Sequence, residues 1–238
     1  MNNNPLVSVV IPIIKNDPYI KKNLWYLENS TYKNLEVIVV DEGRERSYQR
    51  NFGIKKATGK YILYLDSDQF VSPQLIEECV ELCEAGVSAL YIPERITTRG
   101  FFAYLRNWER QFYNGTPIDC VRFMRKNVCP LFDEDLNGPE DSCHDRRVKG
   151  YKLVSRNVLY HEDNVTFLKF FRKKAYYSKS MKRFAQKYPN DKVLSFWWRC
   201  LIVYFEKGKW KRVVKRPDLF VLVMGLIFLR GVVYLCNR

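Results

Sequence analysis

The clearest indication of the fold is the stretch Lys60-Tyr61-Ile62-Leu63-Tyr64-Leu65-Asp66-Ser67-Asp68-Gln69. Its first half is rich in Ile, Leu and Tyr, which is typical of a strand buried on both faces of a parallel sheet. Asp66 and Asp68 then lie at the carboxyl end of that strand, the edge at which open α/β sheets bind ligands. Two carboxylates this close repel each other unless a cation lies between them, and their oxygens suit Mg²⁺ or Mn²⁺. Asp and Ser are also ordinary turn residues, so Asp-Ser-Asp alone favours a solvated loop.

The flanking sequence alternates apolar runs with helical patterns. Ser72-Pro73 predicts the start of a helix that ends at Gly86. Strands are predicted over 7–14, 35–40, 61–65, 87–92, 120–124 and 152–160, and further helices over about 17–29, 45–57 and 101–113 and from Pro139. Strands alternating with helices predict βαβ units, and therefore an α/β fold with a mostly parallel sheet flanked by helices.

The positive charge of the chain is concentrated in its C-terminal third. The formal net charge is +14 over 238 residues; residues 164–238 hold 18 Lys and Arg against three acidic residues, and the first 163 residues hold 22 against 23. This asymmetry predicts a neutral body with a basic segment that attaches to nucleic acid or anionic lipid.

The cysteines indicate a reduced compartment. There are seven, and none lies in a C-x-x-C pair or another zinc-binding spacing. Several occupy apolar positions, where a free cysteine behaves as a small hydrophobe. The N-terminal residues run directly into a strand pattern, so we expect no secretory signal peptide.

The C-terminal third predicts contact with a membrane. Residues 167–174 predict a basic, aromatic helix, and residues 195–205, which include Trp197-Trp198, suit a bilayer interface. Residues 219–236 carry one charge, Arg230, and at ~1.5 Å per residue reach roughly 27 Å, the lower limit for a span. A buried helix of a soluble domain is the alternative. The basic block at 207–216 favours the membrane and places the body on the cytoplasmic side of the cell membrane.

A series of short motifs follows in order along the first 163 residues. They are Val7-Ser8-Val9-Val10-Ile11-Pro12, Val37-Ile38-Val39-Val40-Asp41, Arg50-Asn51-Phe52-Gly53-Ile54 with Ala57-Thr58-Gly59, Leu65-Asp66-Ser67-Asp68, Phe132-Asp133-Glu134 with Leu136, Gly138-Pro139-Glu140-Asp141, and His161. Each is weak alone, but the ordered set resembles the family 2 glycosyltransferases with a GT-A fold. The resemblance implies a catalytic domain over 1–163. The basic and apolar patterns of the tail predict basic amphipathic interface helices over 164–216 and a transmembrane or membrane-embedded helix over 217–238.

The resemblance implies a donor pocket and a metal site. Pro12, Asp41 and Arg50 would belong to the donor pocket, where Asp41 would hydrogen-bond the base or ribose. Asp66 would contact the donor and, with Asp68, bind Mg²⁺ or Mn²⁺, which neutralises the departing nucleoside diphosphate. His161 would be a further ligand or a diphosphate contact; alternatively, it is a strand-end histidine with no role. Glu42 and Ile13-Ile14-Lys15 depart from the commoner family pattern and leave the donor open.

The resemblance also assigns the acceptor side. Asp141 would be the general base that takes the proton of the acceptor hydroxyl, in a single displacement that inverts the anomeric configuration. Glu140 would lie beside it. Arg172 and Lys173 would hold the diphosphate as a lid; contact with phospholipid or solvent is an equal alternative.

The basic tail resembles membrane-bound members of the family, such as cellulose-synthase-like enzymes and polyprenyl-phosphate sugar transferases. The leading hypothesis is therefore transfer of mannose from GDP-mannose (a UDP-sugar being the other donor class) to a hydroxyl of a polyprenyl- or dolichyl-linked saccharide, as in N-glycan biosynthesis. A second hypothesis is transfer onto the bare lipid phosphate. A third is a non-catalytic protein that binds nucleic acid or acidic lipid through residues 164–216. It leaves Asp66, Asp68 and Asp141 unexplained, so no nucleic-acid partner is expected.

Overall fold

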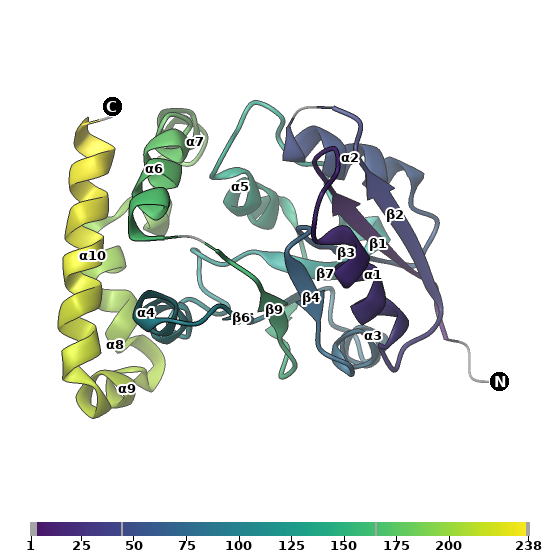
Figure 1. Cartoon of the computed structure of the whole chain (residues 1–238), viewed down its shortest axis with the longest axis horizontal. Helices are drawn as coiled ribbons and strands as arrows, with labels where there is room; N and C mark the ends of the chain where they lie inside the picture. The colour runs from purple at the N-terminus through teal and green to yellow at the C-terminus, as the bar shows by residue number, and fades with distance from the viewer. Residues whose placement is uncertain (1–3, 44, 165, 237–238) are drawn as a thin grey trace.

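A six-stranded mixed sheet forms the centre of the computed structural model, which describes residues 4–43, 45–164 and 166–236 (Figure 1). Its strands, in spatial order, are β2 (Leu35–Val40), β1 (Val7–Pro12), β3 (Tyr61–Tyr64), β7 (Val121–Arg125), β5 (Ala89–Tyr91) and β8 (Lys152–Val154). The β2–β1, β1–β3 and β5–β8 pairs are parallel, and β7 runs antiparallel to both of its neighbours. The predicted α/β fold with a mostly parallel sheet is confirmed.

Helices cover both faces of the sheet, and the side chains of neighbouring residues in a strand point to opposite faces. Val9 packs with residues of α1 (Ile20–Glu28) and α3 (Leu75–Glu84). Val10 packs on the other face with residues of α2 (Arg46–Lys56). This alternation is the period-two pattern of a strand buried on both sides.

The edge strand β2 differs from its prediction in burial. Its bounds match, but Val37 and Val39 are exposed. The prediction of a second fully buried strand is wrong because β2 pairs on one side alone, with β1, and lies at the end of the sheet.

A second, three-stranded sheet was not predicted. It contains β4 (Gln69–Val71), β9 (Leu159–His161) and β6 (Glu94–Ile96), in that order. The run predicted as one strand over 152–160 is broken into β8 and β9 at a turn in which the Ser155 hydroxyl donates to the Asn157 carbonyl (2.9 Å). Ser72 continues the pairing of β4 with a bond to the Val158 carbonyl (3.2 Å), so α3 begins at Leu75 and not at Ser72-Pro73.

Two further helices of the N-terminal part complete the body. They are α4 (Phe101–Arg110) and α5 (Glu140–Arg147), and a short 3₁₀ turn, η1 (Lys126–Val128), follows β7. The C-terminal third then forms α6 (Phe167–Ser178), α7 (Met181–Lys187), η2 (Lys192–Leu194), the π-helical η3 (Trp198–Ile202), α8 (Val203–Phe205), η4 (Glu206–Gly208), α9 (Trp210–Lys215) and α10 (Pro217–Cys236).

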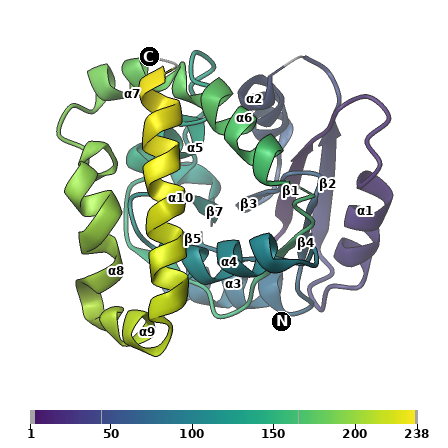
Figure 2. The same ribbon diagram turned by 60° about the vertical axis from the view of Figure 1, so that its left-hand side comes forward.

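The C-terminal helices share an apolar core with α4. Figure 2 shows α10 lying over α4, with α8 and α9 beside it. The buried side chains of this core are Leu105, Trp108, Phe112, Trp198, Val203, Tyr204, Val213, Leu219, Val223 and Leu226. The Trp197-Trp198 pair, predicted to lie together at an interface, is split: Trp197 is exposed and Trp198 is buried.

The outer face of α10 is apolar and uncovered. Val221, Phe228 and Leu235 are 68%, 70% and 67% exposed. Within the part of the chain that the structure describes, α10 is the one helix long and apolar enough to cross a membrane. All seven cysteines lie in that part and are free thiols, most of them buried.

Candidate active site

Helix α2 places a buried arginine at the centre of the site. A Cβ atom on Gly53 would lie 2.3 Å from Val10 Cγ1, so only glycine lets α2 approach β1 this closely. One turn earlier, the fully buried Arg50 donates to Asp66 Oδ1 (2.6 Å) and to Asp141 Oδ1 (2.8 Å). Two carboxylates that are 75 positions apart in sequence are thus fixed by the two ends of one planar guanidinium.

The charge of Arg50 is stabilised by these carboxylates and by two aromatic rings. Its guanidinium lies 5.1 Å from the ring centre of Tyr64 and 4.9 Å from that of Phe132. Burial opposes the charge, but Asp141 and Asp66 hold the pKa of Arg50 above its usual range. Burial likewise opposes ionisation of Asp66, yet Arg50 and Arg46 hold its pKa well below the usual value. Asp66 is therefore an ionised carboxylate near neutral pH.

Asn51 fixes the acidic loop that leads to α5. Its amide nitrogen donates to the Phe132 carbonyl (3.0 Å) and to Glu134 (2.6 Å), and its carbonyl oxygen accepts from the Phe132 N–H (2.6 Å). The adjacent residues Arg50 and Asn51 thus position Asp141 both directly and through the loop before it.

The two acidic residues at the start of α5 have different surroundings. Glu140 is buried, bonded to Arg46 (3.1 Å) and to the Gly138 N–H, and burial together with Asp141 raises its pKa. The Asp141 side chain is 26% exposed and lines the cavity. Asp141 is therefore the better placed of the two to meet a ligand.

Asp68 and His161 meet where the two sheets adjoin. His161 Nε2 lies 3.4 Å from Asp68 Oδ2, and its Nδ1 lies 3.1 Å from Glu94 Oε2. Behind them, the buried Arg122 donates to Glu94 Oε1 (2.7 Å). Burial would lower the pKa of His161, but the hydrogen bonds to Asp68 and Glu94 raise it to about 9.

The residues fit a divalent cation at Asp68 and His161 better than at Asp66, and a cation bound there would replace the proton on His161 Nε2. A metal-binding histidine commonly donates its other ring nitrogen to a carboxylate, which is the position Glu94 takes. Asp66 is engaged by Arg50, and its second oxygen lies 3.9 Å from Arg46. Within residues 4–43, 45–164 and 166–236, no group of three His, Cys, Asp or Glu side chains is placed to hold a metal. A bound ligand would have to supply the remaining oxygens.

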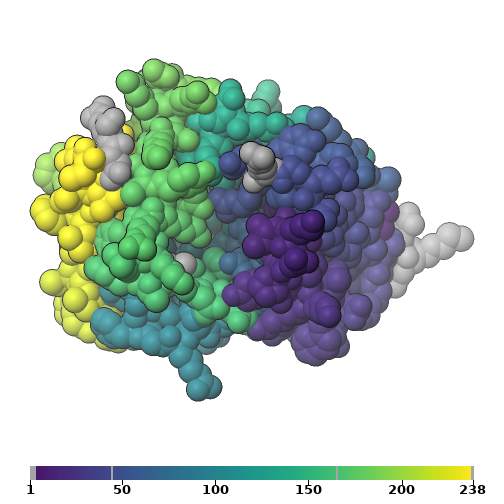
Figure 3. All heavy atoms as spheres, turned by 45° about the horizontal axis from the view of Figure 1, so that its top comes forward, coloured from purple at the N-terminus to yellow at the C-terminus, as the bar shows by residue number. Residues whose placement is uncertain are grey.

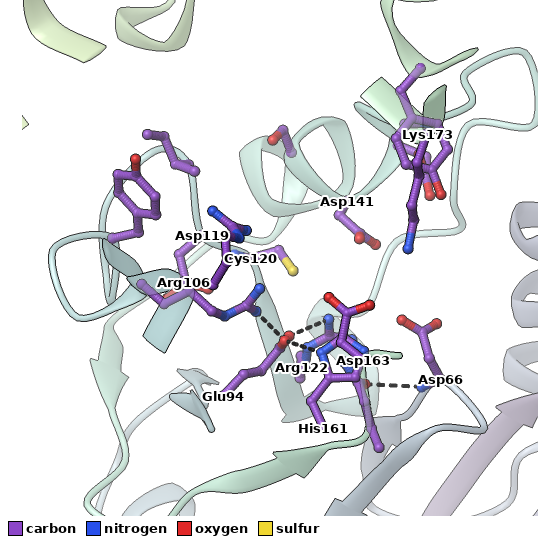
Figure 4. Close-up of a pocket in the computed structure, with 18 of the residues that line it drawn as sticks. Asp66, Glu94, Arg106, Asp119, Cys120, Arg122, Asp141, His161, Asp163 and Lys173 are labelled. Atoms are coloured by element: carbon purple, nitrogen blue, oxygen red, sulfur yellow. Dashed lines mark hydrogen bonds and ion pairs between the residues drawn. The ribbon is translucent and has the colours of Figure 1, made fainter. Parts of the chain in front are cut away.

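Asp66, Asp141 and His161 line one cavity of about 280 Å³, whereas Arg50 and Asp68, which contact them, lie outside its lining. The surface is hollowed where α6 faces the N-terminal half of the chain (Figure 3). Lys173 extends from α6 toward the space between Asp141 and Asp66 (Figure 4). Arg172 is exposed and lies outside the cavity lining, whereas Lys174, which was not predicted, lies within it.

Two predicted donor residues also lie outside the lining. Pro12 is buried at the end of β1, and Asp41 is exposed directly after β2. Both lie at the carboxyl ends of parallel strands, the edge predicted to bind the donor. Their roles stay predictions.

Several residues of the site were missed from the sequence. Glu94 and Arg122 belong to short strands, and a charge inside the apolar run 120–124 was the available signal for Arg122. Asp119 also lines the cavity, accepts the Gly115 and Cys120 N–H groups (2.9 Å each), and has its pKa raised to about 7 by burial. Nothing in its local sequence indicated this environment.

Comparison with known proteins relates the chain to glycosyltransferases. Residues 42–129 match the family model described as glycosyl transferase family 2. The chain is 24% identical over 191 residues to the uncharacterized glycosyltransferase EpsJ of Bacillus subtilis, covering 68% of this chain and 51% of EpsJ. It is 30% identical over 99 residues to glycosyltransferase GlyG of Streptococcus pneumoniae, covering 30% of this chain and 33% of GlyG. The chain spans about half or less of the length of the curated relatives it matches.

Solved structures share the fold. The mannosyltransferase PcManGT from Pyrobaculum calidifontis, in complex with GDP-Man and Mn²⁺, superimposes with a TM-score of 0.59 at 17% identity, covering 96% of this chain and 79% of that one. S. aureus TarS 1-349 in complex with UDP-GlcNAc gives 0.52 at 16% identity, covering 94% and 81%. Residues 42–129 of this chain therefore match the glycosyl transferase family 2 model, and the chain shares the GT-A-like fold of these solved glycosyltransferases.

Proposed function

We propose that the chain is an inverting glycosyltransferase that moves a sugar from a nucleotide sugar to an acceptor hydroxyl. The observation that supports this is the Arg50 bridge, which holds Asp66 at the end of β3 and Asp141 at the start of α5 on one cavity. Such an arrangement puts a donor-side and an acceptor-side carboxylate within the reach of one reacting sugar.

The donor side contains Asp66, Asp68 and His161. Asp68 and His161 would hold Mg²⁺ or Mn²⁺, with Glu94 orienting the His161 ring. When bound, the metal would neutralise charge on the leaving nucleoside diphosphate. Lys173 adds a positive charge on the opposite wall, in reach of the same phosphates.

On the acceptor side, Asp141 takes the proton of the attacking hydroxyl. Arg50 bonds one of its oxygens, Oδ1, and so fixes the carboxylate while Oδ2 makes no bond to Arg50. Attack of the hydroxyl on the anomeric carbon, with departure of the nucleoside diphosphate from the other face, inverts the configuration.

For the donor we favour mannose from GDP-mannose, since the solved neighbour with GDP-Man and Mn²⁺ has the higher TM-score of the two described. For the acceptor we favour a lipid-linked saccharide at the cytoplasmic face of the membrane. The exposed apolar face of α10, with the basic residues of α9 beside it, would bring the cavity to that surface.

A second candidate acceptor is a bare polyprenyl phosphate. The observation that favours it is the pair Lys173 and Lys174, which gives the cavity positive charge suited to a phosphate. Asp141→Asn separates the two candidates, because an ionised phosphate needs no base whereas a hydroxyl does. Loss of transfer with unchanged nucleoside diphosphate binding supports the hydroxyl acceptor; full transfer in this variant supports the phosphate acceptor.

The function is tested by a screen of GDP- and UDP-sugars with the full chain in detergent. We expect release of the nucleoside diphosphate from one donor, dependent on Mg²⁺ or Mn²⁺ and abolished by EDTA. Salt-sensitive binding of single-stranded DNA, with no release from any nucleotide sugar, would overturn the proposal in favour of a nucleic-acid-binding protein.

A further inference from the structure

The wall of the cavity formed by the C-terminal helices carries a group of cations. Arg106 of α4, Lys174 of α6, Arg199 of η3 and Arg230 of α10 all line it. We refer to these four residues as the cationic cluster. They come from four separate elements, so the tertiary fold assembles them and no local motif contains them.

Three of the four cations surround one buried ring. The ring centre of Phe170 lies 4.8 Å from the Arg106 guanidinium, 5.0 Å from that of Arg230 and 5.5 Å from Lys174 Nζ. Each cation–π contact stabilises the cation over the ring face. Because the cations share one poorly hydrated region, they also repel each other, so the ring alone does not balance their charge.

One carboxylate, that of Glu109, forms ion pairs with the cationic cluster. Glu109 accepts two hydrogen bonds from Arg230 (2.7 and 2.9 Å) and one from Arg106. Within the described ranges, neither Lys174 nor Arg199 forms an ion pair with a carboxylate; Arg199 donates to the Val193 carbonyl at 3.4 Å. Burial lowers the pKa of Lys174 well below its usual value, and the three arginines lower it further. The three arginines alone therefore carry more positive charge than Glu109 neutralises.

We propose that the cationic cluster binds a phosphate or diphosphate group of the acceptor. This inference rests on the proposed function, whose acceptor it describes further. Arginine and lysine are the side chains that recognise phosphate, and a bound anion would relieve the repulsion among the four cations.

The position of the cluster favours the acceptor over the donor. Its helices α4, α6 and α10 lie at the end of the molecule away from β1 and β2, whose carboxyl ends mark the donor edge (Figure 1). One of these helices, α10, also carries the exposed apolar face at which a lipid would approach. The cluster and Asp141 share a cavity of about 280 Å³, so the accepting hydroxyl belongs to a sugar close to the phosphate and not to the far end of a long glycan.

The test measures binding of three probes to the full chain in detergent by calorimetry. Farnesyl diphosphate probes a lipid diphosphate, inorganic pyrophosphate probes a soluble phosphorylated acceptor, and GDP or UDP with Mn²⁺ probes the donor site. The variants are Lys174→Gln and Arg199→Gln, which break no ion pair in the described structure. Lys169→Gln is the matched control, because it removes the same charge from the exposed side of α6.

We expect each variant to weaken diphosphate binding by about tenfold or more, while the control and the nucleoside diphosphate affinity stay unchanged. Tighter binding of farnesyl diphosphate than of pyrophosphate supports the site and identifies a lipid source; equal binding supports it with a soluble source. Unchanged diphosphate binding in both variants overturns the inference, as does a loss confined to nucleoside diphosphate. Failure of the donor screen with cluster-dependent diphosphate binding intact would refute the proposed function alone.

Discussion

Arg230 of α10 and Glu109 of α4 form a bidentate ion pair, with N–O distances of 2.7 and 2.9 Å. The pair explains the one charged residue in the apolar run 219–236, because it joins the last helix to the α/β body. Glu109 is fully buried, so the charge faces protein and not lipid. This geometry favours α10 lying along the body with its other face exposed, which is the arrangement of an interfacial helix.

Removal of Glu109 leaves two buried guanidiniums without their carboxylate. We expect Glu109→Gln to lower the free energy of unfolding by about 3–5 kcal/mol, measured by urea denaturation in detergent. In the double variant Glu109→Gln/Arg230→Met one of the stranded charges is gone, so part of that loss should be recovered. Equal stability of Glu109→Gln and the wild type would contradict a structural role for the pair.

Arg50 should be essential for its shape as well as its charge. Lysine keeps the charge but cannot bond Asp66 and Asp141 at once with a planar fork. We expect Arg50→Lys to lower kcat by about 100-fold through misplacement of Asp141, with a smaller change in donor affinity. Arg147→Lys makes the same change at an exposed position of α5 and should leave both unaltered. An unchanged kcat in Arg50→Lys would remove Arg50 from the positioning of the base.

Asp68 should govern metal binding. In Asp68→Asn we expect Mn²⁺ affinity, read as manganese paramagnetic resonance in the presence of nucleoside diphosphate, to fall by about tenfold or more, because an amide oxygen is a weaker ligand than a carboxylate. Metal-dependent turnover should fall with it. The exposed Asp135→Asn is the control. Wild-type Mn²⁺ affinity in Asp68→Asn would place the metal elsewhere.

The sequence predicts the elements whose signal is local. Long apolar runs indicated β1, β2 and β3, and the ordered motifs identified Arg50, Asp66, Asp68, Asp141 and His161, which the fold brings to one cavity or its edge. The reversed direction of β7 was not predictable, because an apolar run reads the same in either orientation. Strands of three residues, such as β6, are too short to show a recognisable alternation of apolar and polar residues.

The other residues that the sequence did not predict depend on which way a helix faces or on contacts between distant parts of the chain. Consecutive residues of a helix differ by about 100° in direction, so an unknown phase on α6 left Lys174 unpredicted and placed Arg172 in the lid. The partner of Arg230 lies 121 positions away, and no spacing rule links them. Glu94 supports His161 from a neighbouring strand, which requires knowledge of the register of the second sheet.

The buried Asp119 predicts a pH dependence of stability. Its pKa is raised to about 7 from an ordinary value of about 4, so between these values the folded state binds more protons than the unfolded state. The free energy of unfolding should therefore fall as pH rises through this window, by at most about 1.4 kcal/mol per pH unit. Asp119→Asn should reduce that slope, measured by urea denaturation at several pH values, whereas Asp135→Asn should preserve it. An identical slope in Asp119→Asn would show that Asp119 titrates normally.

The outer face of α10 should decide membrane retention. Val221, Phe228 and Leu235 are each about two-thirds exposed, and burial of such a side chain in lipid contributes about 1.5 kcal/mol or more. We expect their combined replacement by serine to weaken binding to anionic vesicles by at least about 100-fold in flotation assays, without loss of the fold, since none of the three is in the buried core shared with α4. The exposed Val37 and Val39 on β2, at the opposite end of the molecule, provide the control, and their replacement by serine should leave vesicle binding intact. If the α10 variant still bound as tightly as the wild type, the basic residues of α9 alone would suffice for attachment and α10 would not be the membrane-binding surface.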